Sequence, residues 1–87
     1  MTEARVLVTG GAGFIGNTFV RRLLATSPEA TRVLTFDLLT YAGHLVNLED
    51  LPAPDRHTFQ KGDIADAAAV AAAFEAFEPT AVVNFAA

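Results

Sequence analysis

The residues best suited to chemistry in this 87-residue sequence are the glycines at positions 10–16. They form either a GxxGxxG pattern (Gly10, Gly13, Gly16) or a GxGxxG pattern that starts at Gly11. Such glycines allow a tight turn, let an anion approach the backbone at Gly13, and let a helix lie close to a strand at Gly16. Either spacing is a weak signal alone, but strand and helix patterns beside it predict a pyrophosphate site.

Those flanking patterns are present. Residues 5–9 predict a strand that is apolar on both faces, as in the centre of a parallel sheet. A helical pattern follows the glycines and ends near Pro28. Its predicted apolar face consists of Phe14, Ile15, Phe19, Val20, Leu23 and Leu24. In this order of elements, the first amides and the positive dipole end of the helix face a bound phosphate.

The next predicted strand, residues 32–37, ends on an acid. Asp37 lies 21 residues after Gly16. A dinucleotide fold has a carboxylate at this place, which accepts hydrogen bonds from the adenosine ribose hydroxyls. The alternative is that Asp37 only caps a helix or closes a turn.

The remaining chain continues to alternate strands and helices. Residues 38–57 are the least regular part, although 45–51 can form a short helix. A polar edge strand is predicted over 58–61 and a fourth strand over 81–85. Between them, a helix is predicted from about Ala67 to Phe77, with Asp66 as its N-cap and with Val70, Phe74 and Phe77 as its packing stripe.

This alternation predicts an α/β fold with a Rossmann-type parallel sheet and helices on both faces. The sheet is partial, with four strands in the order 3-2-1-4. The carboxyl ends of strands one and four then frame the ligand crevice, because the winding reverses between them. At 87 residues, the chain is at most one small domain, or part of one.

Composition narrows the classes of partner and compartment. The 52% hydrophobic content argues against disorder, and the absence of cysteine excludes disulfides and thiolate metal sites. A net charge of −4 without a basic cluster argues against nucleic acid or an anionic membrane as a partner. The longest apolar run, residues 67–74, is too short to span a bilayer, and the N-terminus lacks signal-peptide features. We therefore expect a cytoplasmic protein.

These motifs together resemble the extended short-chain dehydrogenase/reductase family. Residues 8–16 look like its N-terminal cofactor signature. Residues 37–48, DLLTYAGHLVNL, are similar to the DKLTYAGNLENL run of the dTDP-glucose 4,6-dehydratases, and residues 62–64 and 84–87 resemble their GDI and HLAA segments. Side chains that depart from the family pattern are Asn17, Leu38, His44 and Asn84. None of them changes the glycines or Asp37.

The resemblance implies that residues 1–87 are the N-terminal part of an NAD-binding Rossmann domain, with the substrate domain absent. It also implies NAD as the cofactor, a sugar nucleotide as the substrate, and a homodimer as the full-length assembly. Such an enzyme passes a hydride from sugar C4 to NAD, eliminates water across C5 and C6, and returns the hydride to C6. The motifs and the resemblance together predict these cofactor-binding residues: Gly10, Gly13, Phe14, Ile15, Gly16, Asp37, Leu38, Thr40, Ala42, Gly43, Asp63, Ile64, Phe85, Ala86 and Ala87.

No catalytic residue is expected within 1–87, because the family's Tyr-x-x-x-Lys pair and Thr-Asp-Glu set lie further along the chain. Tyr41 is followed four positions later by Leu45 instead of lysine. His44 and His57 are expected to be solvated loop residues rather than catalysts or metal ligands. By resemblance, Asp63 lies near the adenine. The 87-residue chain alone is therefore predicted to be inactive.

Two alternative functions stay open at this point. One is another nucleotide-sugar enzyme of the same family, such as a 4-epimerase, although the run at 40–43 argues against it. The other is a dinucleotide-binding module without chemistry, such as a sensor.

Overall fold

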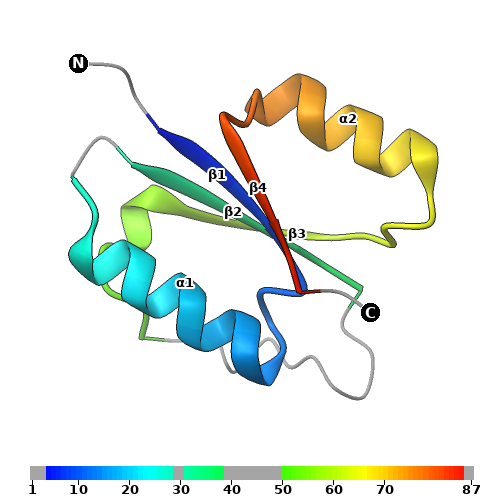
Figure 1. The fold of residues 1–87 in the computed structure, drawn as a ribbon. Coiled ribbons are helices and arrows are strands. Elements are labelled where there is room, and N and C mark those ends of the chain that lie inside the picture. Colours follow the sequence, from blue (N-terminus) through cyan, green and yellow to red (C-terminus); the bar gives the residue numbers. More distant parts are fainter. Residues whose placement is uncertain (1–3, 29–30, 39–49, 86–87) are drawn as a thin grey trace.

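A computed structural model describes residues 4–28, 31–38 and 50–85, and they form a parallel sheet between two helical layers (Figure 1). The strands are β1 (Arg5–Thr9), β2 (Arg32–Asp37), β3 (His57–Lys61) and β4 (Ala81–Asn84). The helices are α1 (Phe14–Thr26), α2 (Ala67–Phe77) and the short 3-10 helix η2 (Pro54–Arg56). Every predicted strand is present, and its bounds agree with the prediction to within one residue.

The sheet has the order β3-β2-β1-β4, and all of its pairs are parallel. The predicted strand order and fold class are therefore confirmed. β1 lies in the centre, where Leu7 pairs with Leu34 of β2 on one side and with Val82 of β4 on the other. Because the strands are parallel, all of their carboxyl ends meet at one edge, which also carries the turn into α1.

Each face of the sheet has its own core, because successive side chains of a strand point to opposite faces. The core on the α1 face contains Val8, Val20, Leu24, Val33 and Leu51. The core on the α2 face contains Leu7, Leu34, Phe36 and Ala73. Figure 1 shows α1 and α2 on opposite sides of the strands, so each helix covers one core, as predicted.

The predicted apolar face of α1 is wrong at its first two members. Phe14 is 87% exposed and Ile15 is 70% exposed. The buried residues of α1 are Gly16, Val20 and Leu24, which follow one another at intervals of four. At about 100° per residue, Phe14 and Ile15 lie well away from this line. They therefore project from the first turn of the helix into solvent.

The predicted packing stripe of α2 is also corrected. Its buried residue is Ala73, whereas Phe74 is 41% exposed. The small side chain of Ala73 lets the helix approach the sheet, and Val70 and Phe77 pack beside it as predicted.

The predicted cap of α2 is confirmed. The Asp66 carboxylate accepts hydrogen bonds from the backbone amides of Ala68 (3.1 Å) and Ala69 (3.2 Å).

Two further expectations concern the less regular part of the chain. Most of the short helix expected over 45–51 lies outside the described residues. Among the residues that the structure describes, no helix is long and apolar enough to cross a membrane.

Candidate dinucleotide site

The turn between β1 and α1 begins with Gly10 in the left-handed region, at φ 74°. Glycine adopts this conformation without the steric cost that a Cβ would bring. The Gly10 amide donates to the carbonyl oxygen of Phe36 in β2 (2.9 Å), and the Gly13 amide donates back to the Gly10 carbonyl (3.1 Å). Gly10 thus makes the tight turn that the motif predicted.

Gly16 brings α1 into close contact with this turn. A Cβ at Gly16 would overlap the Gly10 carbonyl oxygen and lie 2.9 Å from both the Gly10 carbonyl carbon and Gly11 Cα. These neighbours are backbone atoms, which have no rotamer by which to give way. The predicted close approach at Gly16 is therefore present, and its partner is the turn that follows β1.

Gly11 also has a steric reason to be glycine. Its Cβ would lie 2.5 Å from Cγ2 and 3.0 Å from Oγ1 of Thr35, a fully buried residue of β2. Gly10, Gly11 and Gly16 are therefore all in positions that disfavour a side chain. The GxxGxxG pattern leaves out Gly11 and the GxGxxG pattern leaves out Gly10, so neither pattern includes all three. Sequence reasoning missed Thr35. Its signal is a hydroxyl within the otherwise apolar run of residues 33–36.

Asp37 reaches the turn from the carboxyl end of β2. Its Oδ2 accepts a hydrogen bond from the buried Ala12 amide (2.9 Å). A carboxylate can accept about four hydrogen bonds, so this contact is compatible with the predicted bonds from ribose hydroxyls. The contact also shows that Asp37 closes a turn, which was the alternative role. The structure places the predicted ribose acid beside the predicted pyrophosphate turn.

The N-terminus of α1 opens at the same edge of the sheet. Its N-cap is Gly13, which has no side chain with which to cap the helix, and the described first turn contains no acidic residue. The first amides of any α-helix lack partners within the helix. Here they belong to Phe14, Ile15 and Gly16. The helix dipole adds positive potential at this end, so the geometry suits an anion.

The ends of β1 and β4 are joined beside this turn. The Phe85 amide donates to the Thr9 carbonyl oxygen (2.8 Å), and the Phe85 ring lies 5.4 Å from that of Phe19 in α1. The Thr9 hydroxyl donates to Asn84 Oδ1 (2.5 Å). Phe85 therefore lies beside the end of β1 and against Phe19 of α1, and its predicted role in binding cofactor stays a prediction.

The other predicted site residues lie at the ends of β2 and β3 or beyond the described chain. Leu38 is 43% exposed directly after Asp37. Asp63 closes a local turn, because its Oδ1 accepts from the Ala65 amide (2.9 Å), and Ile64 is partly exposed beside it. The predicted contact of Asp63 and Ile64 with adenine stays a prediction, as does the cofactor-binding role of Leu38. The positions outside the described residues are Thr40, Ala42, Gly43, Ala86 and Ala87.

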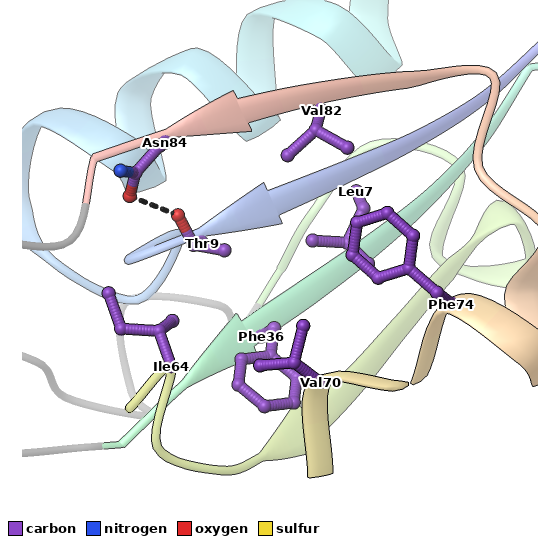
Figure 2. Close-up of a pocket in the computed structure, with 8 residues that line it drawn as sticks. All are labelled: Leu7, Thr9, Phe36, Ile64, Val70, Phe74, Val82 and Asn84. Atoms are coloured by element: carbon purple, nitrogen blue, oxygen red, sulfur yellow. Dashed lines mark hydrogen bonds between the residues drawn. The ribbon is translucent and has the colours of Figure 1, made fainter. Parts of the chain in front are cut away.

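Ile64 also borders a pocket of about 220 Å³ between α2 and the sheet. Figure 2 shows its apolar wall, with Phe74 of α2 facing Leu7 and Val82, and the Thr9–Asn84 hydrogen bond at one end. The complete lining is Leu7, Thr9, Phe36, Ile64, Val70, Phe74, Val82 and Asn84. The pocket lies on the α2 face, whereas the glycine turn leads into α1 on the other face.

His57 is not the solvated loop residue that the sequence predicted. It is the first residue of β3, it is half-buried, and its Nε2 lies 2.7 Å from Thr35 Oγ1 in a hydrogen bond. Burial removes water from the ring and lowers the pKa of His57 below its usual 6.5. The pattern of residues 57–61 did not reveal this, because polar residues at an edge strand are usually solvated. His44 lies outside the described residues.

Known proteins are similar to this chain in both sequence and fold. The family profile described as GDP-mannose 4,6 dehydratase matches residues 7–87. A dTDP-glucose 4,6-dehydratase from Xanthomonas campestris pv. campestris (strain B100) is 49% identical over 81 residues, which cover 93% of this chain and 22% of that protein.

Solved structures agree. A dTDP-glucose 4,6-dehydratase from Bacillus anthracis in complex with NAD has a TM-score of 0.90 and 37% identity, covering 97% of this chain and 27% of that one. A UDP-glucose 4-epimerase from Thermotoga maritima, with UDP-glucose, has a TM-score of 0.79 and 31% identity, covering 95% of this chain and 24% of that one.

The chain thus spans roughly a quarter of these proteins or less. The relatives confirm the resemblance to dTDP-glucose 4,6-dehydratases that the sequence motifs indicated. The profile match begins within β1 and includes the glycine turn, Asp37 and β4. On this basis, the chain belongs to the GDP-mannose 4,6 dehydratase family.

Proposed function

We propose that this chain is the NAD-binding part of a nucleotide-sugar 4,6-dehydratase that converts dTDP-glucose to its 4-keto-6-deoxy product. One observation carries the proposal: Asp37 Oδ2 accepts a hydrogen bond from the Ala12 amide within the glycine turn. This contact holds Asp37, the acid proposed to bind the ribose, beside the turn that leads into α1. The NAD complex of the Bacillus anthracis dehydratase supports the proposal.

In this arrangement each part of the cofactor meets a different element. The pyrophosphate lies at the first turn of α1, where amides and the helix dipole favour negative charge. The adenosine ribose binds Asp37. A 2′-phosphate at that ribose would be repelled by the carboxylate, so NAD is preferred over NADP. When bound, NAD supplies the acceptor for the sugar's hydride, and the residues described here bind and orient it.

Proton transfer requires groups that this chain is not expected to contain. A general acid or base must be positioned close to the reacting atoms of the sugar. The family resemblance assigns these groups to a later part of the full-length protein. The 87 residues alone are therefore predicted to bind NAD without turning over dTDP-glucose. A homodimer and a cytoplasmic location are proposed for the full-length protein, with the sugar nucleotide as its partner molecule.

Calorimetric titration with NAD and NADP tests the cofactor assignment. We expect the parent chain to bind NAD measurably and NADP much more weakly. In Asp37→Ser, the difference between the NAD and NADP affinities should be smaller. Asp55→Ser is the matched control, because Asp55 is an exposed acid of η2. Equal binding of NAD and NADP by the parent chain would show that Asp37 does not contact the ribose.

The likeness to the Thermotoga maritima epimerase keeps a 4-epimerase as the second candidate. Incubating the product of the complete open reading frame with dTDP-glucose and NAD separates the two activities. A 4-keto-6-deoxy sugar supports the dehydratase, and inversion at C4 supports the epimerase. Turnover by residues 1–87 alone would contradict the assignment of the catalytic groups to a later part of the protein.

A further inference from the structure

We propose that Thr35 and His57 act as a positioning pair beneath the glycine turn, an inference that rests on the proposed dinucleotide binding. Neither residue belongs to the glycine motif, and neither is expected to touch the cofactor. Their role is to hold the Gly11 backbone at the distance from β2 at which the neighbouring amides can bind the pyrophosphate. Three observations support it: the packing of Thr35 against Gly11, the Thr35–His57 hydrogen bond, and the way β2 holds the turn.

Thr35 is a fully buried polar residue on the α1 side of β2. The space where a Gly11 side chain would lie is taken by the Thr35 side chain, since a Cβ there would lie 2.5 Å from Cγ2 and 3.2 Å from the Thr35 Cβ. The turn therefore rests directly on this threonine. No side chain fits between the Gly11 backbone and Thr35, so we infer that the position of the Thr35 side chain limits how closely Gly11 approaches β2.

The hydrogen bond to His57 decides which part of Thr35 faces Gly11. The methyl and hydroxyl groups of threonine have similar size, and a rotation of roughly 120° about χ1 can put one of them where the other was. The 2.7 Å contact between Oγ1 and His57 Nε2 fixes the hydroxyl toward β3. Cγ2 is then the closest atom to the Gly11 site. Without His57, the buried hydroxyl would lose its partner and the side chain would no longer be held in one rotamer.

The same part of β2 holds the turn at two more points. The Gly10 amide donates to the Phe36 carbonyl, and the Ala12 amide donates to the Asp37 carboxylate. Three consecutive residues of β2 therefore contact three consecutive residues of the turn. Thr35 is the steric member of this set, so its rotamer sets the spacing between β2 and the turn. Hydrogen bonds weaken steeply with poor distance and angle, which links this spacing to cofactor affinity.

The contact with Gly11 is tested by second-site rescue. Gly11→Ala should weaken NAD binding at least about tenfold, because overpacking at this contact displaces the turn. Adding Thr35→Ser removes Cγ2 but keeps the hydroxyl for His57, and it should restore most of the affinity. Urea unfolding of the same variants without NAD measures the rescue as stability. Failure of Thr35→Ser to rescue either quantity would overturn the contact.

The hydrogen bond is tested by a double-mutant cycle. Thr35→Val and His57→Leu each remove one partner of the same bond, so each should weaken NAD binding about five- to tenfold, and the double variant should lose no more than the larger single effect. Adenosine, which has no phosphate, should bind all of these variants like the parent. Thr58→Val is the matched control, since Thr58 is an exposed neighbour in β3.

The outcomes separate this inference from the proposed function. If the parent chain does not bind NAD, the proposed function fails, while the cycle in unfolding stability still tests the pair. If the parent binds NAD and the two substitutions are additive, or adenosine weakens equally, the positioning role is overturned. Parent-like NAD affinity in His57→Leu would also overturn it.

Discussion

The helices α1 and α2 begin at the same edge of the sheet, but their N-terminal amides are capped differently. At α2, the Asp66 carboxylate accepts hydrogen bonds from the amides of Ala68 and Ala69. At α1, the cap position is Gly13, which has no side-chain acceptor. Both caps have extended backbone, with φ −89° and ψ 99° at Asp66 and φ −75° and ψ 175° at Gly13. The difference therefore lies in the side chain and not in the entry of the chain into the helix.

The N-terminus of α2 is thus capped by a side chain of its own chain, whereas the uncapped N-terminus of α1 suits an anion. A carboxylate at an N-cap occupies the site where a phosphate would bind and brings the same sign of charge. Gly13 leaves that position open, while the turn before it is held firmly by β2. An open N-terminus on a rigid support suits ligand binding, because little ordering is needed when the ligand arrives.

The strongest way to break the comparison is to give α1 the cap of α2. Gly13→Asp should lower NAD affinity about 100-fold or more, because the carboxylate takes the first amides and repels the pyrophosphate. Gly13→Ser places a neutral cap at the same position and should cost less affinity. Calorimetric titration measures both, and circular dichroism should show unchanged helix content. NAD binding by Gly13→Asp with parent affinity would remove the helix terminus from the site.

A second test concerns the support of the open helix. In a typical helix, replacing glycine by alanine stabilises by about 0.5–1 kcal/mol. Gly16→Ala should have the opposite sign and cost about 1–3 kcal/mol, because its Cβ would overlap the Gly10 carbonyl oxygen. Urea unfolding gives the free energy of unfolding. A stabilised Gly16→Ala would mean that α1 does not lie as close to the turn as described.

Opening the capped helix should have a smaller effect. Asp66→Ala should lower the free energy of unfolding by about 1 kcal/mol, the usual cost of losing an N-cap. Asp66→Asn keeps a capping oxygen and should cost less. NAD affinity should stay at the parent value in both variants, as measured by calorimetry. A clear loss of NAD binding would place the start of α2 within the cofactor site.

The smallest expected effect is on pH dependence. Burial lowers the pKa of His57 in the folded state below 6.5, so the unfolded chain binds more protons once the pH falls below about 6.5. The contribution of His57 to stability is therefore complete above that pH and decreases as the pH falls through it. Urea unfolding at several pH values should show a steeper loss in the parent than in His57→Gln. Parallel profiles would contradict the burial of this ring.

The sequence predicted the framework of the site well, because its signals are local. Strand patterns, the glycine spacing and the position of Asp37 all depend on neighbours in the chain, and the cap at Asp66 depends on residues two and three positions later. The contacts that hold the turn are of another kind. The Ala12–Asp37 bond and the Thr35–His57 bond join residues 25 and 22 positions apart.

Helix faces were predicted less well. Phe14 and Ile15 are apolar but exposed, because the line of closest approach in α1 starts at a glycine that no hydrophobic pattern reveals. Ala73 likewise replaces Phe74 as the buried residue of α2, because closeness to the sheet favours the small side chain. Residue size at a helix–sheet contact is set by the spacing between the layers, which a single sequence does not state.

The central position of β1 has a consequence for the order in which the fold can assemble during synthesis. β1 is translated before β4, and one of its edges is covered only once β4 has been made. The hydrogen bond from the Arg5 amide to the Thr80 hydroxyl, across 75 residues, joins these two parts of the chain. The nascent chain thus carries its glycine turn and Asp37 long before the sheet that holds them is complete. Such non-local pairing slows folding. Because β4 completes the sheet beside β1, the binding edge can form fully only after β4 has been synthesised.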